Sequence, residues 1–190
     1  RMELVKRALI ALVVMFPVIW FFVLHSYQKM RILVLFNPSV DPYGSGYHVI
    51  QSKISIGSGG FLGQGLFEGT QSQLNFLPEN HTDFIFSVIG EELGFIGAIF
   101  VIFLYFVLLY RTIMISRSSG DSFGSLLACG IFSMWLFQVF INVGMTLGIM
   151  PVTGIPLPFM SYGGSALVMN LLCVGILMNI YLRRKKLMFD

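Results

Sequence analysis

Four apolar segments, each long enough to cross a lipid bilayer, constrain the fold of this chain more than any other feature. A hydrocarbon core of about 30 Å is crossed by about 17–25 helical residues. Pro17 interrupts the first segment, but a spanning helix tolerates a proline as a kink when neighbouring groups satisfy the freed carbonyl. The sequence therefore predicts an all-α integral membrane protein with transmembrane helices at approximately Ala8–His25, Leu93–Tyr110, Gly124–Val143 and Gly164–Leu182.

The composition agrees with a membrane protein and argues against a soluble domain. Of 190 residues, 56% are hydrophobic and only 11% are charged, which leaves too little polar surface to cover an ordinary soluble fold. The net charge is +3, but the basic residues lie beside apolar segments rather than along one exposed stripe, so no nucleic acid partner is expected. Cys129 and Cys173 lie inside apolar segments without the spacing of a zinc site or a redox pair.

The basic residues also orient the predicted helices. If the four segments alternate in direction, most of the cations fall on one side, which the positive-inside rule makes cytoplasmic. Both ends of the chain are then expected in the cytoplasm, and residues 26–92 and 147–163 are expected to form extracytoplasmic loops of a multi-pass membrane protein. The majority side carries Arg1, Lys6, Arg7, Arg111, Arg117, Arg183, Arg184, Lys185 and Lys186, and the opposite side carries Lys29, Arg31 and Lys53.

The two predicted outer loops differ from ordinary connections. A stretch as long as residues 26–92 normally has its own structure or a function, and residues 47–56 within it fit either an interfacial helix or a strand. The glycine-rich residues 57–65 match neither GxGxxG nor GxxxxGK[ST], so a nucleotide site is not predicted. Residues 147–163 combine prolines and glycines with apolar residues. Such backbone is tolerated at membrane depth only against protein or a cavity, so we expect a re-entrant wall of a site.

Acidic residues gather at the predicted outer boundary of the second apolar segment. If Asn80 caps a helix, Asp83 lies in its first turn, where the helix dipole stabilises a carboxylate by about 0.3–1 kcal/mol. On that helix Asp83 and Glu91 would be about 12 Å apart, too far to share a proton, so we expect one carboxylate per chemical step. Ser87 would lie on the same face as Asp83. A structural and a chemical role for Asp83 both remain open.

Three neighbours of Asp83 have similar alternatives. Glu91 and Glu92 are adjacent and point about 100° apart, so at most one faces a given cavity and either is explained as a buried packing ion. His81 has the chemistry of an acid, a base or a metal ligand, but histidines near helix starts also serve as hydrogen-bonded structural groups.

Three blocks of the sequence resemble the RodA/FtsW/SpoVE family of shape, elongation, division and sporulation proteins. They are residues 75–86 (NFLPENHTDFIF), 90–94 (GEELG) and 151–165 (PVTGIPLPFMSYGGS). Residues 69–74 (GTQSQL) resemble RodA more than FtsW. The resemblance covers essentially the whole chain but implies about ten spans, so residues 1–190 are expected to be the C-terminal half of such a protein.

The resemblance implies a peptidoglycan glycosyltransferase that polymerises lipid II on the outer face of the bacterial cytoplasmic membrane during cell elongation. Its expected partners are a class B penicillin-binding protein, other elongation-complex membrane proteins and membrane lipids. The family's essential loop aspartate corresponds to Asp83, as the general base for the acceptor hydroxyl or as a ligand of Mg²⁺ or Mn²⁺ on the diphosphate. Supporting or substrate-binding residues are expected at Glu79, His81, Thr82, Ser87, Glu91, Glu92, Pro158, Ser161, Tyr162, Gly163 and Gly164.

Two alternatives to catalysis are a lipid II transporter and a scaffold that only positions the penicillin-binding protein. A transporter needs polar residues through the full membrane depth, whereas almost all acids of these segments lie at the outer edge. Extracytoplasmic catalysis is therefore favoured.

Overall fold

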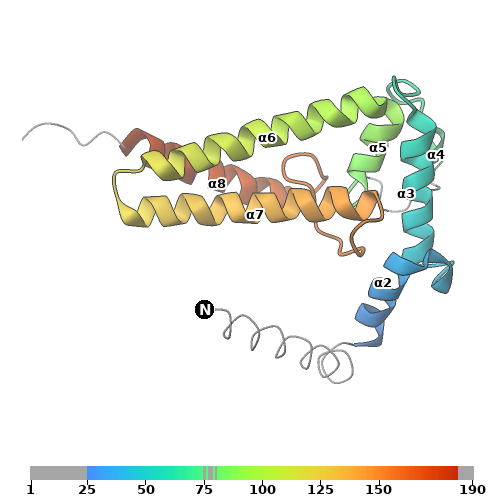
Figure 1. Ribbon diagram of the computed structural model, residues 1–190. Coiled ribbons are helices and arrows are strands. Elements are labelled where there is room, and N and C mark those ends of the chain that lie inside the picture. Colours follow the sequence, from blue (N-terminus) through green and yellow to red (C-terminus); the bar gives the residue numbers. More distant parts are fainter. Residues whose placement is uncertain (1–24, 75, 77–78, 80, 184–190) are drawn as a thin grey trace, which may run out of the picture. The chain divides into compact units, whose positions relative to one another are not determined.

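The computed structural model describes residues 25–74, 76, 79 and 81–183, and within these ranges it is helical or irregular with no strand. The chain divides into two compact units, Arg1–Tyr47 and His48–Asp190, and each is described by itself. The helices are α2 (Ser26–Phe36), the 3-10 helix η2 (Pro38–Val40), α3 (Ser45–Gly59), α4 (Thr70–Gln73), α5 (Ile85–Glu92), α6 (Gly94–Ser118), α7 (Ser122–Thr146) and α8 (Gly164–Arg183) (Figure 1).

Hydrogen bonds at chain reversals shape the described part of the first unit. The backbone N–H of Asn37 closes α2 on the carbonyl of Leu33 at 2.9 Å, and the Asn37 side chain accepts from the N–H of Ser39 in η2 at 3.1 Å. The Asp41 carboxylate then accepts from the N–H of Ser45 at 2.8 Å, where α3 begins. Asx residues favour such turns because their side chains bond nearby backbone. This part of the predicted outer loop therefore has its own structure.

Three of the four predicted spans are confirmed as long apolar helices. Among the described residues, α6, α7 and α8 are long and apolar enough to cross a membrane, whereas the predicted span Ala8–His25 lies outside the described residues except for His25. The helix α6 continues to Ser118, beyond the apolar segment that ended at Tyr110. At 25 residues it is about 37 Å long, which exceeds the hydrocarbon thickness and allows its last turns to lie among headgroups.

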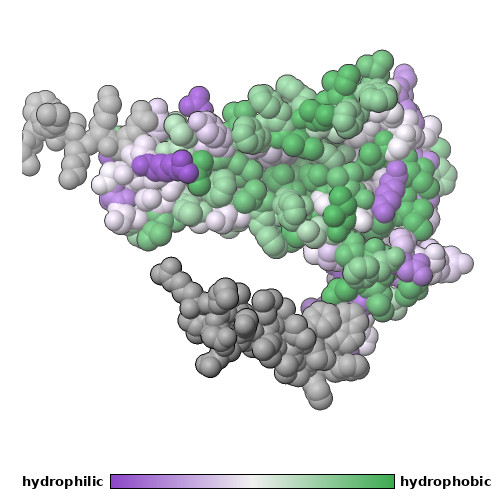
Figure 2. Space-filling model, in the orientation of Figure 1, coloured by the Kyte–Doolittle hydropathy of each residue, from purple (hydrophilic) through white to green (hydrophobic). Residues whose placement is uncertain are grey.

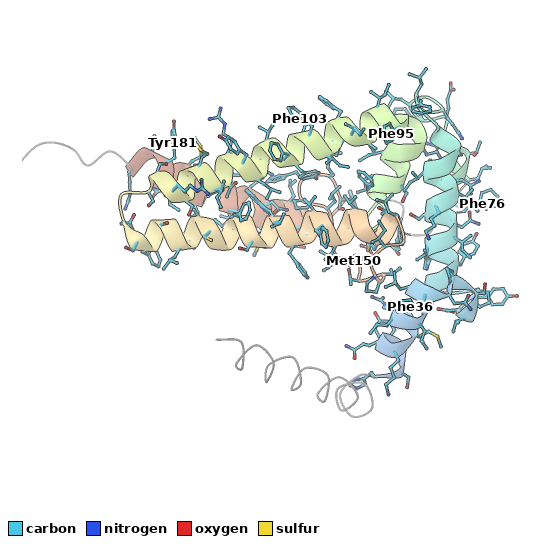
Figure 3. All side chains as sticks on the ribbon, viewed as in Figure 1. Phe36, Phe76, Phe95, Phe103, Met150 and Tyr181 are labelled. Atoms are coloured by element: carbon cyan, nitrogen blue, oxygen red, sulfur yellow. The ribbon has the colours of Figure 1, made fainter. Side chains whose placement is uncertain are left out.

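The three long helices pack through two clusters of buried side chains. One joins α7 to α8 around Trp135, whose indole N–H donates to the Asn170 Oδ1 at 2.8 Å. The other joins α5 and α6 to the α7–α8 connection and includes Phe86, Tyr105 and Leu157. The outward surface over α6 and α7 is mainly hydrophobic, with hydrophilic residues where α6 passes into α7 (Figure 2). Large apolar side chains such as Phe95 and Phe103, each 55% exposed, lie along α6 (Figure 3), as expected of a surface meeting lipid or further protein.

The segment that fitted a helix or a strand is helical, as part of α3. The glycine-rich residues that follow pack their backbone against the α5–α6 junction. Gly63 has φ +83°, and a Cβ placed on it would lie 2.1 Å from the Glu92 carbonyl oxygen, so only glycine fits there. The N–H of Gly65 donates to that same carbonyl at 3.1 Å. Close backbone approach thus accounts for this part of the glycine-rich pattern.

Candidate functional site

The turn that contains Asp83 ends before α5 begins. Glu79 has φ +54°, and its carbonyl oxygen accepts from the N–H groups of Thr82 and Phe84 at 3.2 and 3.3 Å. These bonds close a turn, so α5 starts only at Ile85 with Phe84 as its N-cap residue. The expected helix with Asp83 in its first turn is wrong, and Asn80 lies outside the described residues. Asp83 is therefore a half-buried turn residue, placed before the helix rather than inside its first turn.

The proline-rich connection between α7 and α8 is bonded directly to this turn. The Ser161 hydroxyl donates to the carbonyl of Thr82 at 2.6 Å and accepts from the N–H of Leu157 at 2.7 Å. Beside it, the N–H of Tyr162 donates to the carbonyl of His81 at 2.9 Å. Thus the turn at residues 81–83 and the second predicted outer loop, about eighty residues apart in sequence, are joined by hydrogen bonds.

The Asp83 carboxylate lies against Gly154. Gly154 has φ +76°, and a Cβ added to it would lie 3.1 Å from the Asp83 Oδ2. A side chain at this position would be strained by the backbone conformation and would crowd the carboxylate. The glycine therefore forms one wall of the space that Asp83 occupies.

The α7–α8 connection descends well below the ends of the long helices. The Tyr105 hydroxyl of α6 donates to the carbonyl of Pro158, and Phe159 packs edge-on against Trp135 of α7 with ring centroids 5.5 Å apart. Tyr105 is eleven residues from the start of α6 and Trp135 eleven residues from the end of α7, about 16 Å along each helix. Figure 1 shows the orange connection beside α7. These contacts place the connection beside the middle of α6 and α7, and the re-entrant loop stays a prediction.

Glu91 is fully buried and bonded on both carboxylate oxygens. Its Oε1 accepts from the N–H of Gln71 at 2.7 Å, while its Oε2 accepts from the N–H of Ser72 at 3.1 Å and from the hydroxyl of Ser55 at 2.9 Å. Charge-assisted bonds of this kind offset the cost of burying a carboxylate. The neighbouring Glu92 is only half-buried. Glu91 thus ties α3, α4 and α5 together, which is a supporting role.

A buried hydroxyl pair extends this polar interior toward α7. The hydroxyls of Ser52 and Ser87 lie 2.6 Å apart, and the Ser52 hydroxyl donates to the carbonyl of Thr146 at 2.7 Å. Because that bond uses the only hydroxyl hydrogen of Ser52, the Ser87 hydroxyl is the donor within the pair. Ser87 therefore serves to fix α5 against α3 and the end of α7.

Asn142 of α7 bonds to both the Asp83 turn and the α7–α8 connection. It has no exposed surface, and its Nδ2 donates to the carbonyls of Asp83 at 2.9 Å and Ile155 at 2.8 Å. Neither Asn142 nor Tyr105 was among the residues selected from sequence. A polar residue inside an apolar span is costly unless bonded, so their position within such segments was the available signal.

Four other predicted site residues and Glu79 differ in their exposure. The Glu79 side chain is exposed and accepts from the Thr82 hydroxyl at 3.0 Å, and Tyr162 is 82% exposed. Pro158 is fully buried. A Cβ added to Gly163 would meet only the Cβ of Ala166, at 3.6 Å, and one added to Gly164 would meet nothing within 4 Å among the described residues.

A metal site formed by protein groups alone is not present in the described part of the chain, where no three His, Cys, Asp or Glu side chains are grouped to hold an ion. Magnesium is commonly bound by one or two carboxylates together with substrate phosphates. Asp83 fits that second kind of site.

Comparison with known proteins places the chain in a family. Residues 2–186 match the family model FTSW_RODA_SPOVE, described as cell cycle protein. The chain is 48% identical over 185 residues to the peptidoglycan glycosyltransferase MrdB of Escherichia coli, covering 97% of this chain and 50% of that protein. It is 49% identical over 162 residues to the peptidoglycan glycosyltransferase RodA of Treponema pallidum, covering 85% of this chain and 37% of that protein.

A solved structure has a similar fold. A chain of a peptidoglycan synthase complex, described as coordinating polymerization and crosslinking, superposes with a TM-score of 0.76 at 31% identity over 97% of this chain and 50% of that one. The chain thus spans about half the length, or less, of these relatives. With nearly all of its sequence matched, this multi-pass membrane chain belongs to the FtsW/RodA/SpoVE family.

Proposed function

We propose that this chain contributes the reacting carboxylate of a peptidoglycan glycosyltransferase, which polymerises lipid II on the outer face of the cytoplasmic membrane during cell elongation. The observation that carries the proposal is the position of Asp83: a carboxylate in a turn, half-buried and packed against Gly154 of a descending loop. The names of the related proteins from Escherichia coli and Treponema pallidum support the same reaction class.

The reaction requires a base and a stabilised leaving group. A sugar hydroxyl of the acceptor attacks the anomeric carbon of the donor, a new C–O bond forms, and the bond to the undecaprenyl diphosphate breaks with its electron pair leaving on the diphosphate. Asp83 accepts the hydroxyl proton in this scheme. A bond to the carbonyl of Asp83 from Asn142 and one to the carbonyl of Thr82 from Ser161 hold the backbone on which the base is mounted.

Binding a divalent cation is the second role open to Asp83. Mg²⁺ or Mn²⁺ held between Asp83 and the diphosphate would neutralise charge on the leaving group. In both schemes Asp83 supplies the negative charge, and the hydrogen bonds of its turn hold it in position.

Polymerisation outside the membrane requires Asp83 to face outward, with both ends of this chain in the cytoplasm. A class B penicillin-binding protein is the proposed partner that crosslinks the product. The similarity to a chain from a synthase complex that coordinates polymerization and crosslinking supports this partner.

A lipid II transporter and a non-enzymatic scaffold are the competing functions. The sequences of α6, α7 and α8 contain no Asp or Glu, and the described acids near the site lie in the turn and in α5. Ionisable groups along the depth of a membrane mark transport pathways. The described acids near the site are instead concentrated at one end of the long helices, which favours a reaction at the membrane surface.

The complete protein that carries this chain tests the proposal when it is incubated with lipid II, with and without a class B penicillin-binding protein, and assayed for glycan polymer. We expect Asp83→Asn to lower polymerisation at least about 100-fold, the lower range for loss of a general base, with membrane level and partner binding unchanged. Glu68→Gln, which neutralises an exposed acid of the same outer stretch, is the control and should retain activity. Polymerisation by Asp83→Asn at the parent rate would favour the transporter or the scaffold instead.

A further inference from the structure

Asn142 occupies a buried position where its two N–H hydrogens have specific acceptors. Both acceptors are backbone carbonyls, at Asp83 and Ile155, so only the amide nitrogen side of Asn142 satisfies them. The two carbonyl acceptors therefore determine which end of the amide is the nitrogen and which is the oxygen.

The other end of the same side chain shows what the position requires. The Asn142 Oδ1 is buried and has no hydrogen-bond partner among the described residues. An unpaired buried acceptor is costly, and an apolar side chain of similar volume would avoid that cost. The position carries an amide because two donors are needed there.

We propose that Asn142 is a positioning residue that sets the Asp83 carboxylate against the α7–α8 connection. One donor holds the backbone of Asp83 itself, and the other holds Ile155, the residue next to the Gly154 that meets the carboxylate. A single rigid group on α7 thereby fixes two segments that are otherwise joined mainly through Ser161 and Tyr162. The inference rests on the proposed function of Asp83 for its catalytic consequence, but not for its structural one.

Kinetics of the complete protein provide the first test. Asn142→Leu keeps the approximate volume and removes both donors. We expect kcat for lipid II polymerisation to fall about 10- to 100-fold with KM changed less than about threefold, because a displaced base slows the reaction step more than binding. Gln138→Leu is the matched control: Gln138 lies one turn away on α7, is half-buried and has a buried Oε1 with no hydrogen-bond partner among the described residues.

A second measurement does not depend on activity. His81→Cys combined with Tyr162→Cys places thiols on the two segments, at residues joined by a backbone hydrogen bond. A short bifunctional crosslinker should join them efficiently in the parent background and at least about threefold less in Asn142→Leu, since loss of both donors leaves the segments held mainly by the bonds of residues 161 and 162. Gln138→Leu should crosslink as the parent does.

The variant Asn142→Asp distinguishes positioning from simple packing. Its carboxyl can donate one hydrogen bond when protonated and none when ionised, so crosslinking relative to the parent should decrease as pH is raised. Parent-level kcat and crosslinking in Asn142→Leu would overturn the proposal, as would parent-level crosslinking in Asn142→Asp at a pH where its carboxyl is ionised. If Asp83→Asn remains active, the proposed function fails, while the crosslinking comparison still decides the role of Asn142.

Discussion

At the scale of single residues, the site depends on a glycine and a carboxylate that meet. Gly154 adopts a left-handed conformation, and the Asp83 Oδ2 lies 3.1 Å from the point where a Cβ of residue 154 would stand. The carboxylate needs this space because the neighbouring backbone is held by Ser161 and by Asn142. Even one methyl group at residue 154 therefore requires Asp83 or the loop to shift by a few tenths of an ångström.

Gly154→Ala tests this contact. The added Cβ meets the carboxylate at 3.1 Å and the φ of +76° is unfavourable for alanine by about 1 kcal/mol. We expect polymerisation by the complete protein to fall at least about tenfold, because a small misplacement of a reacting group is costly. The control is Gly57→Ala in α3, where a Cβ would meet nothing within 4 Å among the described residues. Equal activity of the two variants would show that the carboxylate does not need this space.

At the scale of secondary structure elements, Glu91 connects three helices. Its carboxylate accepts the N–H groups of Gln71 and Ser72 and the hydroxyl of Ser55. Hydrogen bonds to a charged group contribute about 1.5–3 kcal/mol each. The four-residue helix α4 has little stability of its own, so its attachment depends on this side chain.

Glu91→Gln should loosen α4 without unfolding the long helices. The new amide N–H₂ group cannot accept from backbone donors, so at least one of the two backbone bonds is lost. We expect amide hydrogen exchange at Gln71 and Ser72 to become at least about tenfold faster, equivalent to about 1.4 kcal/mol. Exchange in α7 should not change. Glu92→Gln is the control, because Glu92 bonds to this region through its backbone carbonyl, which accepts from the N–H of Gly65. Unchanged exchange at Gln71 and Ser72 in Glu91→Gln would contradict this assignment.

At the scale of the whole molecule, the three long helices set which loops share a membrane face. The α5–α6 junction, the α7–α8 connection and the end of α3 lie at one end of the bundle in the second unit, as Figure 1 shows. The α6–α7 turn lies at the other end, next to the exposed Arg117 and Ser118 in the last turn of α6. The positive-inside rule predicts that this second end is cytoplasmic.

Cysteine labelling in intact cells tests that orientation. Gln73→Cys and Ser118→Cys place single exposed thiols at the two ends of the bundle, in a background without Cys129 and Cys173. An impermeant maleimide added outside should label the first position and not the second. Labelling of residue 118 from outside would reverse the topology and with it the proposed extracytoplasmic reaction. Gln73 is exposed, whereas the adjacent Ser72 is buried and would label poorly.

The sequence by itself determined the membrane class, the described long helices and the blocks that resemble the family. These features depend on local hydropathy and contiguous motifs, so no distant contact is needed to find them. The expected helix start at Asn80 failed because the turn closed by Glu79 is stabilised by the loop bonded to Thr82 and His81. Only the tertiary structure decided the roles of Asn142, Gly154 and Glu91. Asn142 and Asp83 are separated by 59 positions, and the partners of a buried polar group follow from folding rather than from its neighbours in the chain.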